Sequence, residues 1–289
     1  RPERLREPRP MTLQRIAETA LNRLAAVIFP TVLLVVVVIA LVGHFGEAQA
    51  PSGTELPLRA LDLGREAGDA PARLAARVLH SPPRPVVHTD LSTGLFALVA
   101  SADAPRADGS WSIEFPSRHA LEMTCWDLET DARLGRATRD LQDGRFRRSR
   151  GGFALELDAG TRQVDLFCTA RFRGPAKLTA QVWTAEALEQ ARSAHTRAGA
   201  MIDAGLGLLA LAMLAMAVIN RSALYSALVV WLLLSMRMAS LSAGTDFDWL
   251  GIPIPTEWLV PVRQWTVCMY SAATVALFSQ LFRLELAAI

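Results

Sequence analysis

Two charged residues fall within apolar stretches that are long enough to be membrane helices. Asp203 precedes an uncharged run that continues to Ile219, and Arg237 interrupts a second run from Ser222 to Gly244. The turn at Asn220-Arg221 predicts antiparallel neighbouring helices, on which the two charges would lie at similar heights. Because a lone charge is costly within a bilayer, the sequence predicts an Asp203–Arg237 ion pair. The alternative is that Arg237 extends to the lipid headgroups.

The three cysteines fall in two different settings. Cys125 and Cys168 each lie on the apolar face of a predicted strand, in a region that we expect to be exported, where disulfides form. Cys268 lies in a predicted membrane helix and is expected to remain a thiol. A bridge between Cys125 and Cys168 requires α-carbons within about 7 Å. Two separate buried thiols are the alternative that the sequence leaves open.

Two further features have side chains suited to ligand binding. Trp126 lies on the strand face opposite Cys125, where an indole ring could stack on a sugar or pack against another part of the protein. A basic run on or beside a strand could hold an anion, or could form a solvated hairpin; its members are Arg145, Arg147, Arg148 and Arg150. The candidate ligand-binding residues are therefore Trp126, Arg145, Arg147 and Arg148.

The sequence does not predict catalysis by this segment. It has no P-loop, no His-Glu-x-x-His motif and no nucleophile elbow. Its five histidines lack the spacing of a helical metal site, so no metal or other cofactor is expected. The 30 basic and 28 acidic residues nearly cancel, leaving a net charge of +2, and we therefore expect no nucleic-acid partner.

Four apolar stretches indicate a membrane protein. The first, Leu24 to Val42, would form a helix of about 29 Å, close to the thickness of a hydrocarbon core. Arginines in residues 1–23 place the N-terminus in the cytoplasm by the positive-inside rule; the alternative is a signal peptide cleaved after Ala50. Further spans are expected at about 199–219, 222–244 and 263–283, which places residues 43–198 outside and the C-terminus in the cytoplasm.

The exported region has the pattern of a β-sandwich. Residues Glu47 to Pro85 are interpreted as a lead-in with a helical patch at Ala70 to Leu79, and the core is expected at about 86–190. Period-two alternation and turn signals predict strands near residues 94–100, 111–115, 121–125, 152–157, 164–172 and 176–183. A helix from Ala185 to about His195 should then lead into the membrane. The predicted fold class is thus an exported β-sandwich with four transmembrane α-helices.

Particular stretches of both regions carry a family resemblance. In the exported region they are Trp111-Ser-Ile-Glu-Phe-Pro, Leu121-Glu-Met, Arg147 to Arg150, Phe153 to Gly160, Val164 to Phe172 and Ala180 to Ala187; in the membrane region they are Asn220 to Ala227, Ala243-Gly244 and Phe278 to Leu286. From Phe96 onward the chain resembles bacterial seven-transmembrane receptors with diverse intracellular signalling modules, the DISM family. The resemblance implies a jelly-roll exported domain and the first three helices of a seven-helix bundle.

The resemblance also implies a function. The chain would be the sensor region of a receptor in the bacterial inner membrane and one piece of a longer protein. A cytoplasmic output domain would follow Ile289, most often a diguanylate cyclase that makes cyclic-di-GMP and otherwise a histidine kinase. The expected partners are the lipid bilayer, an unidentified extracytoplasmic ligand, for which carbohydrate is one option, and a second copy in a homodimer. The alternative is a membrane-anchored carbohydrate-binding or structural envelope protein without signalling output.

Overall fold

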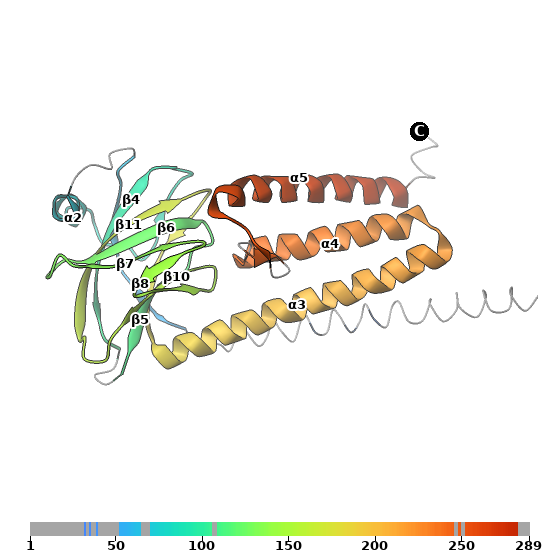
Figure 1. The fold of residues 1–289 in the computed structure, drawn as a ribbon. Coiled ribbons are helices and arrows are strands. Elements are labelled where there is room, and N and C mark those ends of the chain that lie inside the picture. The colour runs from blue at the N-terminus through green and yellow to red at the C-terminus, as the bar shows by residue number, and fades with distance from the viewer. Residues whose placement is uncertain are drawn as a thin grey trace, which may run out of the picture.

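The computed structural model consists of a β-rich region followed by three long helices (Figure 1). It describes residues 52–64, 70–105, 109–245, 248–249 and 252–282, and three separate residues, Val32, Val35 and Ile39. The first predicted span, apart from those three residues, lies outside the described residues, as do residues 1–23 and the end of the chain after residue 282.

Two antiparallel sheets pack face to face around a common core and form the sandwich. The first sheet has the order β1 (Thr54–Leu56), β13 (Ala180–Thr184), β5 (Trp111–Phe115), β10 (Gly152–Leu157) and β9 (Phe146–Ser149). The second has the order β2 (Arg59–Asp62), β4 (Leu95–Asp103), β11 (Gln163–Phe172), β6 (Ala120–Asp127), β7 (Arg133–Thr138) and β8 (Gln142–Gly144). Two small pairs complete the strands: β3 (Val87–His88) with β12 (Lys177–Leu178), and β14 (Asp248–Trp249) with β15 (Ile252–Pro253).

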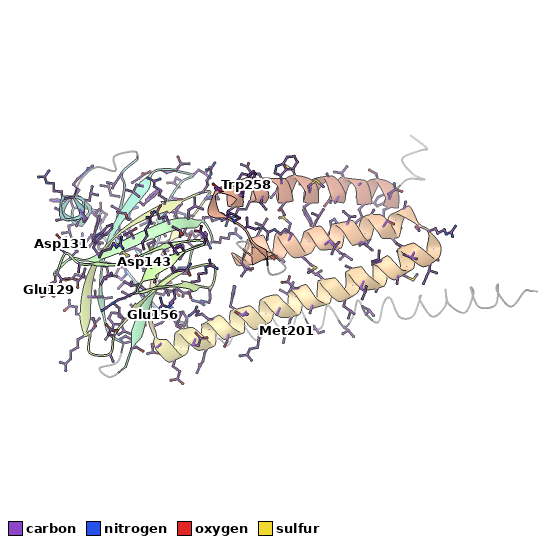
Figure 2. The ribbon with its side chains drawn as sticks, in the orientation of Figure 1. Glu129, Asp131, Asp143, Glu156, Met201 and Trp258 are labelled. Carbon is purple, nitrogen blue, oxygen red and sulfur yellow. A yellow bond between two sulfur atoms is a disulfide. The ribbon has the colours of Figure 1, made fainter. Side chains whose placement is uncertain are left out.

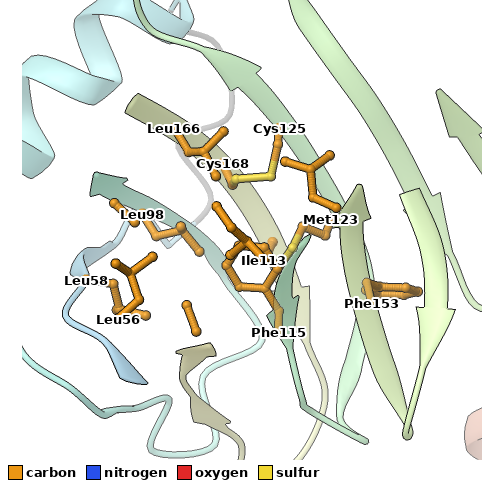
Figure 3. Packing of buried hydrophobic residues seen from close by; sticks show 14 of the residues in the cluster. Leu56, Leu58, Leu98, Ile113, Phe115, Met123, Cys125, Phe153, Leu166 and Cys168 are labelled. Carbon is orange, nitrogen blue, oxygen red and sulfur yellow. A yellow bond between two sulfur atoms is a disulfide. The ribbon is translucent and has the colours of Figure 1, made fainter. Parts of the chain in front are cut away.

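The core lies between the inward faces of the two sheets. Alternate residues of each strand point inward, and they bring Ile113 and Phe115 of the first sheet against Leu98 and Met123 of the second (Figure 3). Cys125 of β6 and Cys168 of β11 face each other in the strand ladder and form a disulfide. Of the two alternatives that the sequence leaves open, the structure therefore has the bridge.

A short helix, α2 (Pro71–Leu79), covers the outer face of the second sheet. Its buried residues Leu74 and Val78 pack against Val99 of β4 and Phe167 of β11. The hydrophobic side of the helix therefore closes a second, smaller core, at the end of the sandwich far from the long helices (Figure 1).

Three long helices follow the sandwich: α3 (Ala185–Asn220), α4 (Ala223–Ala243) and α5 (Thr256–Leu281). Arg221, in the left-handed conformation with φ 48°, forms the tight turn between α3 and α4. These two helices pack through a cluster that includes Leu209, Met213 and Leu232. Helix α5 lies beside α4, where Trp231 Nε1 donates a hydrogen bond to Thr274 Oγ1 at 3.1 Å.

Two of the described helices, α3 and α4, are long and apolar enough to cross a membrane. Their mean hydropathies over the most apolar 18 residues are 2.3 and 1.6, and only 28% and 11% of those residues are buried. The core helix of a soluble protein would be mostly buried, so the exposure of these two helices favours membrane association. Helix α5, which contains the predicted span at 263–283, is not among these two.

The strand pattern agrees with the structure over most of the sandwich, and the beginning of the domain differs. The stretch interpreted as a lead-in, Glu47 to Pro85, contributes β1 to one sheet and β2 to the other, besides α2. These strands have only three and four residues, too short for alternation to be visible in the sequence. The predicted helices at 185–195 and 199–219 are one continuous helix, α3.

Candidate functional site

The sandwich and the helices are joined through β13, which runs directly into α3. Thr184 is both the last residue of the strand and the N-cap of the helix, and its Oγ1 accepts a hydrogen bond from the Ala187 backbone N–H at 3.3 Å. The first turns of α3 lie on the outer face of the first sheet, where Leu188 and Ala191 pack with Trp183. An interior strand of the sheet is therefore connected to a helix of membrane-spanning length without an intervening loop.

A buried carboxylate stabilises the sheet face on which α3 begins. Glu114 of β5 is 0% exposed, and the Ser149 hydroxyl donates to its Oε1 at 2.6 Å. The guanidinium of Arg150 donates through Nε to Oε1 at 3.1 Å and through Nη2 to Oε2. The same guanidinium lies 4.7 Å from the centroid of the Trp183 ring. The charge of Glu114 is therefore compensated, and the β9–β10 turn is held against this face.

That turn also approaches the end of α4. Gly151 has a φ of 83°, and a Cβ added to it would lie 2.9 Å from the Ala243 carbonyl oxygen. A Cβ on Gly244, which ends α4 with a φ of 74°, would lie 2.8 Å from the Gly151 Cα. Both positions require glycine because of their positive φ and because the two backbones are so close.

A second contact lies at the β5–β6 connection. Arg118 donates through Nη1 to the Ser242 carbonyl oxygen at 3.2 Å, and Arg263 of α5 donates to the Arg118 carbonyl oxygen at 3.1 Å. His119 Nδ1 lies 3.0 Å from the Arg173 carbonyl oxygen. Burial lowers the pKa of His119, and the nearby guanidinium of Arg118 lowers it further.

Between these contacts lies a cavity of about 160 Å³, which we call the basic pocket. Its cationic and titratable lining consists of Arg139, Arg148, Arg150, Arg192 and His195. Arg139 is buried and donates to the Ala120 and Ser117 carbonyl oxygens at 2.7 and 3.0 Å. Arg192 of α3 donates to the Arg148 carbonyl oxygen at 2.6 Å. The pocket therefore combines side chains from the sandwich and from α3.

A larger cavity of about 540 Å³ lies between α3 and α4, and we call it the interhelical cavity. Much of its lining is apolar and includes Met201, Ile202, Ala239 and Ile39. Figure 2 shows Met201 further along α3 than the junction with the sandwich. The two cavities are adjacent because His195, Thr196 and Thr245 line both.

Of the predicted ligand-binding arginines, the structure places only Arg148 at the basic pocket. Arg145 forms an ion pair with Asp158 at 2.7 Å, and Arg147 forms one with Glu156 at 3.5 Å. Both guanidinium groups are on the exposed surface, and Figure 2 shows Glu156 on the sandwich. Adjacent residues of a strand point to opposite faces, so Arg147 and Arg148 of the basic run lie on opposite faces of β9.

Trp126 lies away from this junction. Its ring is half-buried, and its centroid is 5.6 Å from that of Phe167 in the small core that α2 covers. The ring therefore packs against the small core, and sugar stacking stays a prediction.

The predicted ion pair between Asp203 and Arg237 is absent from the ion pairs of the described residues. On α4 it is Ala239 that lines the interhelical cavity with Asp203. Arg237, which is 3% exposed, lies two residues before Ala239, about 200° around the helix. Arg237 therefore lies on another side of α4 than the residues that line the interhelical cavity with Asp203.

Three important residues of the junction were not singled out from the sequence: Glu114, Arg139 and Arg192. Glu114 did carry a signal, because it alternates with the inward-facing Ile113 and Phe115 and so had to lie on the outer face of the sheet. No group of three or more metal-ligating side chains occurs within the described ranges. No protein-family model and no curated protein matches the chain, so the interpretation of this site depends on its geometry.

Proposed function

We propose that the chain is the sensor region of a bacterial inner-membrane receptor. In this proposal the sandwich is a jelly-roll domain outside the cytoplasm, and α3, α4 and α5 cross the membrane. The first apolar stretch anchors the N-terminus, and both ends of the chain are cytoplasmic. An output domain follows in the cytoplasm, a diguanylate cyclase in the first instance and otherwise a histidine kinase.

The observation that carries this proposal is the uninterrupted passage from β13 into α3. A strand inside a sheet moves with its neighbours, and a helix that starts at the end of that strand receives the movement directly. The hydrogen bond from Arg192 to the Arg148 carbonyl oxygen and the Gly151–Gly244 approach link the same sheet to α3 and α4. A change in the sandwich can therefore shift the packing of α3 against α4, which is the step that signalling requires.

The order of the strands supports the jelly-roll assignment. The chain passes repeatedly between the sheets, giving the neighbour orders β1-β13-β5-β10 and β4-β11-β6-β7. A jelly roll is a double sheet of eight strands with this type of alternation. The exposed apolar surface of α3 and α4, for example Leu211 at 63% and Val218 at 70%, supports membrane insertion.

The proposal is tested by interrupting this connection in the full-length receptor. Three glycines inserted between Thr184 and Ala185 should change the basal output, measured as cellular cyclic-di-GMP or as autophosphorylation. The same insertion between Glu129 and Thr130, in an exposed turn of the other sheet at the end of the sandwich away from the long helices (Figure 2), is the matched control and should leave the output unchanged. Unaltered output from a stably inserted Thr184 variant would contradict signalling through α3, as would a reading frame without an output domain.

A further inference from the structure

The adjacent side chains of Arg118 and His119 lie where the sandwich meets both α4 and α5. We propose that they form a proton-sensitive latch, in which protonation of His119 releases Arg118 from the end of α4. The ligand that acts on this junction is then the proton itself. The inference deepens the proposed function and rests on it for the effect on signalling, whereas the latch depends only on the contacts of these side chains.

Arg118 caps α4 from the side of the sandwich. Its Nη1 donates to the Ser242 carbonyl oxygen at 3.2 Å, and Ser242 lies in the last turn of α4, where carbonyl groups have no partner within the helix. The helix dipole also favours a cation at this end. A Cβ added to Gly244 would lie 3.0 Å from the Arg118 Cβ, so the two chain segments are in close contact. Loss of the hydrogen bond would therefore uncap α4 and weaken its attachment to the sandwich.

The hydrogen bonds of His119 define which ring nitrogen carries the hydrogen. Nδ1 lies 3.0 Å from the Arg173 carbonyl oxygen, which can only accept, so Nδ1 is the donor. Nε2 is then unprotonated, and it accepts a hydrogen bond from Arg118 Nε at 3.3 Å. The observed contact therefore requires the neutral ring and uses both of its nitrogens.

Protonation of His119 must occur at Nε2, the nitrogen that accepts from Arg118. Because the imidazolium has two donors and no acceptor, Arg118 Nε would then face a second N–H as well as a like charge. The ring is held by the β11–β12 turn, where a Cβ on Gly174 would lie 2.9 Å from Nδ1. Arg118 is exposed, so its guanidinium is the group that can move, and its movement takes Nη1 away from the Ser242 carbonyl oxygen.

The surroundings of His119 favour the neutral ring while the latch is closed. Burial lowers its pKa most, and the hydrogen bond to the Arg173 carbonyl opposes this effect. Three guanidinium groups lower the pKa further: Arg118 of the same connection, Arg263 of α5 and Arg139 directly after β7. The pKa rises when Arg118 moves away, so acid favours the open latch, and the closed state is lost as the pH falls below 6.5.

A second histidine lies near the same end of α4. His195 of α3 lines the basic pocket together with Thr245, which follows α4. His195 is therefore the competing source of a pH effect at this end, and it has to be tested separately.

The test follows hydrogen exchange at the end of α4 in the whole chain, inserted in nanodiscs of a neutral phospholipid. The backbone N–H groups of Gly244 and Thr245 donate to the Leu241 and Ser240 carbonyl oxygens and report on this end. Their protection is compared between about pH 7.5 and 5.0, after correction for the intrinsic pH dependence of amide exchange. We expect it to fall about three- to tenfold at the lower pH, the effect of losing one exposed hydrogen bond.

Variants assign the effect to the latch. His119→Gln has an uncharged acceptor at every pH and should keep the protection that the unmodified chain has at neutral pH. Arg118→Gln removes the cap and should lower the protection at both pH values, without a further fall in acid. The controls are His195→Gln and His88→Gln, at an exposed position of β3, and both should retain the full response to pH.

Three results would overturn the latch: protection in the unmodified chain that does not change with pH, an acid response that persists in His119→Gln, or a response that His195→Gln abolishes. Signalling is measured separately in the full-length receptor, where acid should change the output and His119→Gln should remove this change. If exchange at α4 responds to acid as expected but the output does not, the latch stands and the receptor proposal fails. If the output responds to acid while exchange at α4 does not, the latch is wrong and the receptor proposal stands.

Discussion

At the scale of single residues, the charge of Glu114 is the most deeply buried of the charges at the junction. Replacing Glu114 by Gln leaves the guanidinium of Arg150 without its counter-charge in a partly buried position. We expect this change to destabilise the sandwich by about 2 to 4 kcal/mol, somewhat less than the roughly 3 to 5 kcal/mol for breaking a fully buried pair, because Arg150 is 23% exposed. The measurement is the free energy of unfolding of the whole chain in detergent, followed by tryptophan fluorescence.

The control for this prediction lies in the same sheet. Glu156→Gln removes the partner of Arg147, in an ion pair whose side chains are about half exposed and 3.5 Å apart. Because exposed pairs contribute little, the cost should stay below about 1 kcal/mol. Equal effects of the two substitutions would show that burial of Glu114 does not set the strength of its interaction.

His119 should make the stability of the sandwich depend on pH. Burial and neighbouring arginines lower its pKa from the ordinary value of 6.5, so the folded state favours the neutral ring. The unfolded state therefore binds a proton first, and stability is lost as pH falls through 6.5 toward the lower pKa of the folded state.

His119→Asn should reduce this loss. The change in melting temperature between about pH 7.5 and 5.5 should be smaller for the variant than for the unmodified chain. His88→Asn, at an exposed position of β3, is the control and should leave the pH dependence as it was. If both variants retain the full dependence, other groups cause it.

For single residues, the sequence predicted the strand face on which a residue lies better than it predicted which residue it contacts. The alternation placed Cys125 and Cys168 correctly on apolar strand faces, but whether they are paired depends on the register of β6 against β11. Similarly, the residue count from the α3–α4 turn predicts similar heights for Asp203 and Arg237 but not which way each side chain faces. Their distance depends on the rotation of α4, which the packing of whole helices determines.

At the scale of elements, the close approach of the β9–β10 turn to α4 predicts a difference between two glycines. Gly151 and Gly160 both have positive φ, at 83° and 103°, so alanine is strained at each. Only at Gly151 would the added Cβ meet another element, 2.9 Å from the Ala243 carbonyl oxygen; nothing lies within 4 Å of a Cβ at Gly160.

We therefore expect Gly160→Ala to cost about 1 kcal/mol and Gly151→Ala about 2 to 3 kcal/mol. Gly151→Ala should also increase hydrogen exchange at the end of α4, because the turn must move away from Ala243. Gly160→Ala should leave exchange in α4 unchanged. Equal costs and no change in α4 would show that the sandwich and α4 are not in close contact.

The elements differ in how well their sequences define them. Strands β5 and β10 agree with the prediction residue for residue, because each has a full alternating pattern bounded by turn residues. Strands β7 and β8 were not predicted, since they lie at the edge of the sheet and contain arginines, glycines and polar residues. Pairing with β6, not local pattern, determines β7.

At the scale of the whole molecule, the lengths of the helices define a topology. Helix α4 is long enough to cross a bilayer once, and the connection at Arg221 is too short to return to the other side, so in the proposed receptor α3 and α4 cross in opposite directions. The sandwich precedes α3 and contacts the far end of α4 through Gly151 and Ser242. The proposal therefore puts the sandwich on the opposite side of the membrane from Arg221.

Fusions to alkaline phosphatase, which is active only outside the cytoplasm, test this arrangement. A fusion after Gly160 should be active and a fusion after Arg221 inactive, because the proposal has the sandwich outside the cytoplasm and the α3–α4 turn inside it. A fusion after Leu286 should be inactive if α5 also crosses, since a third crossing returns the chain to the side of Arg221. An active Leu286 fusion beside an inactive Arg221 fusion would leave α3 and α4 as the only crossings among these helices. It would place α5 on the outer surface, where its contacts with Arg118 and α4 would have to be maintained without a membrane around it.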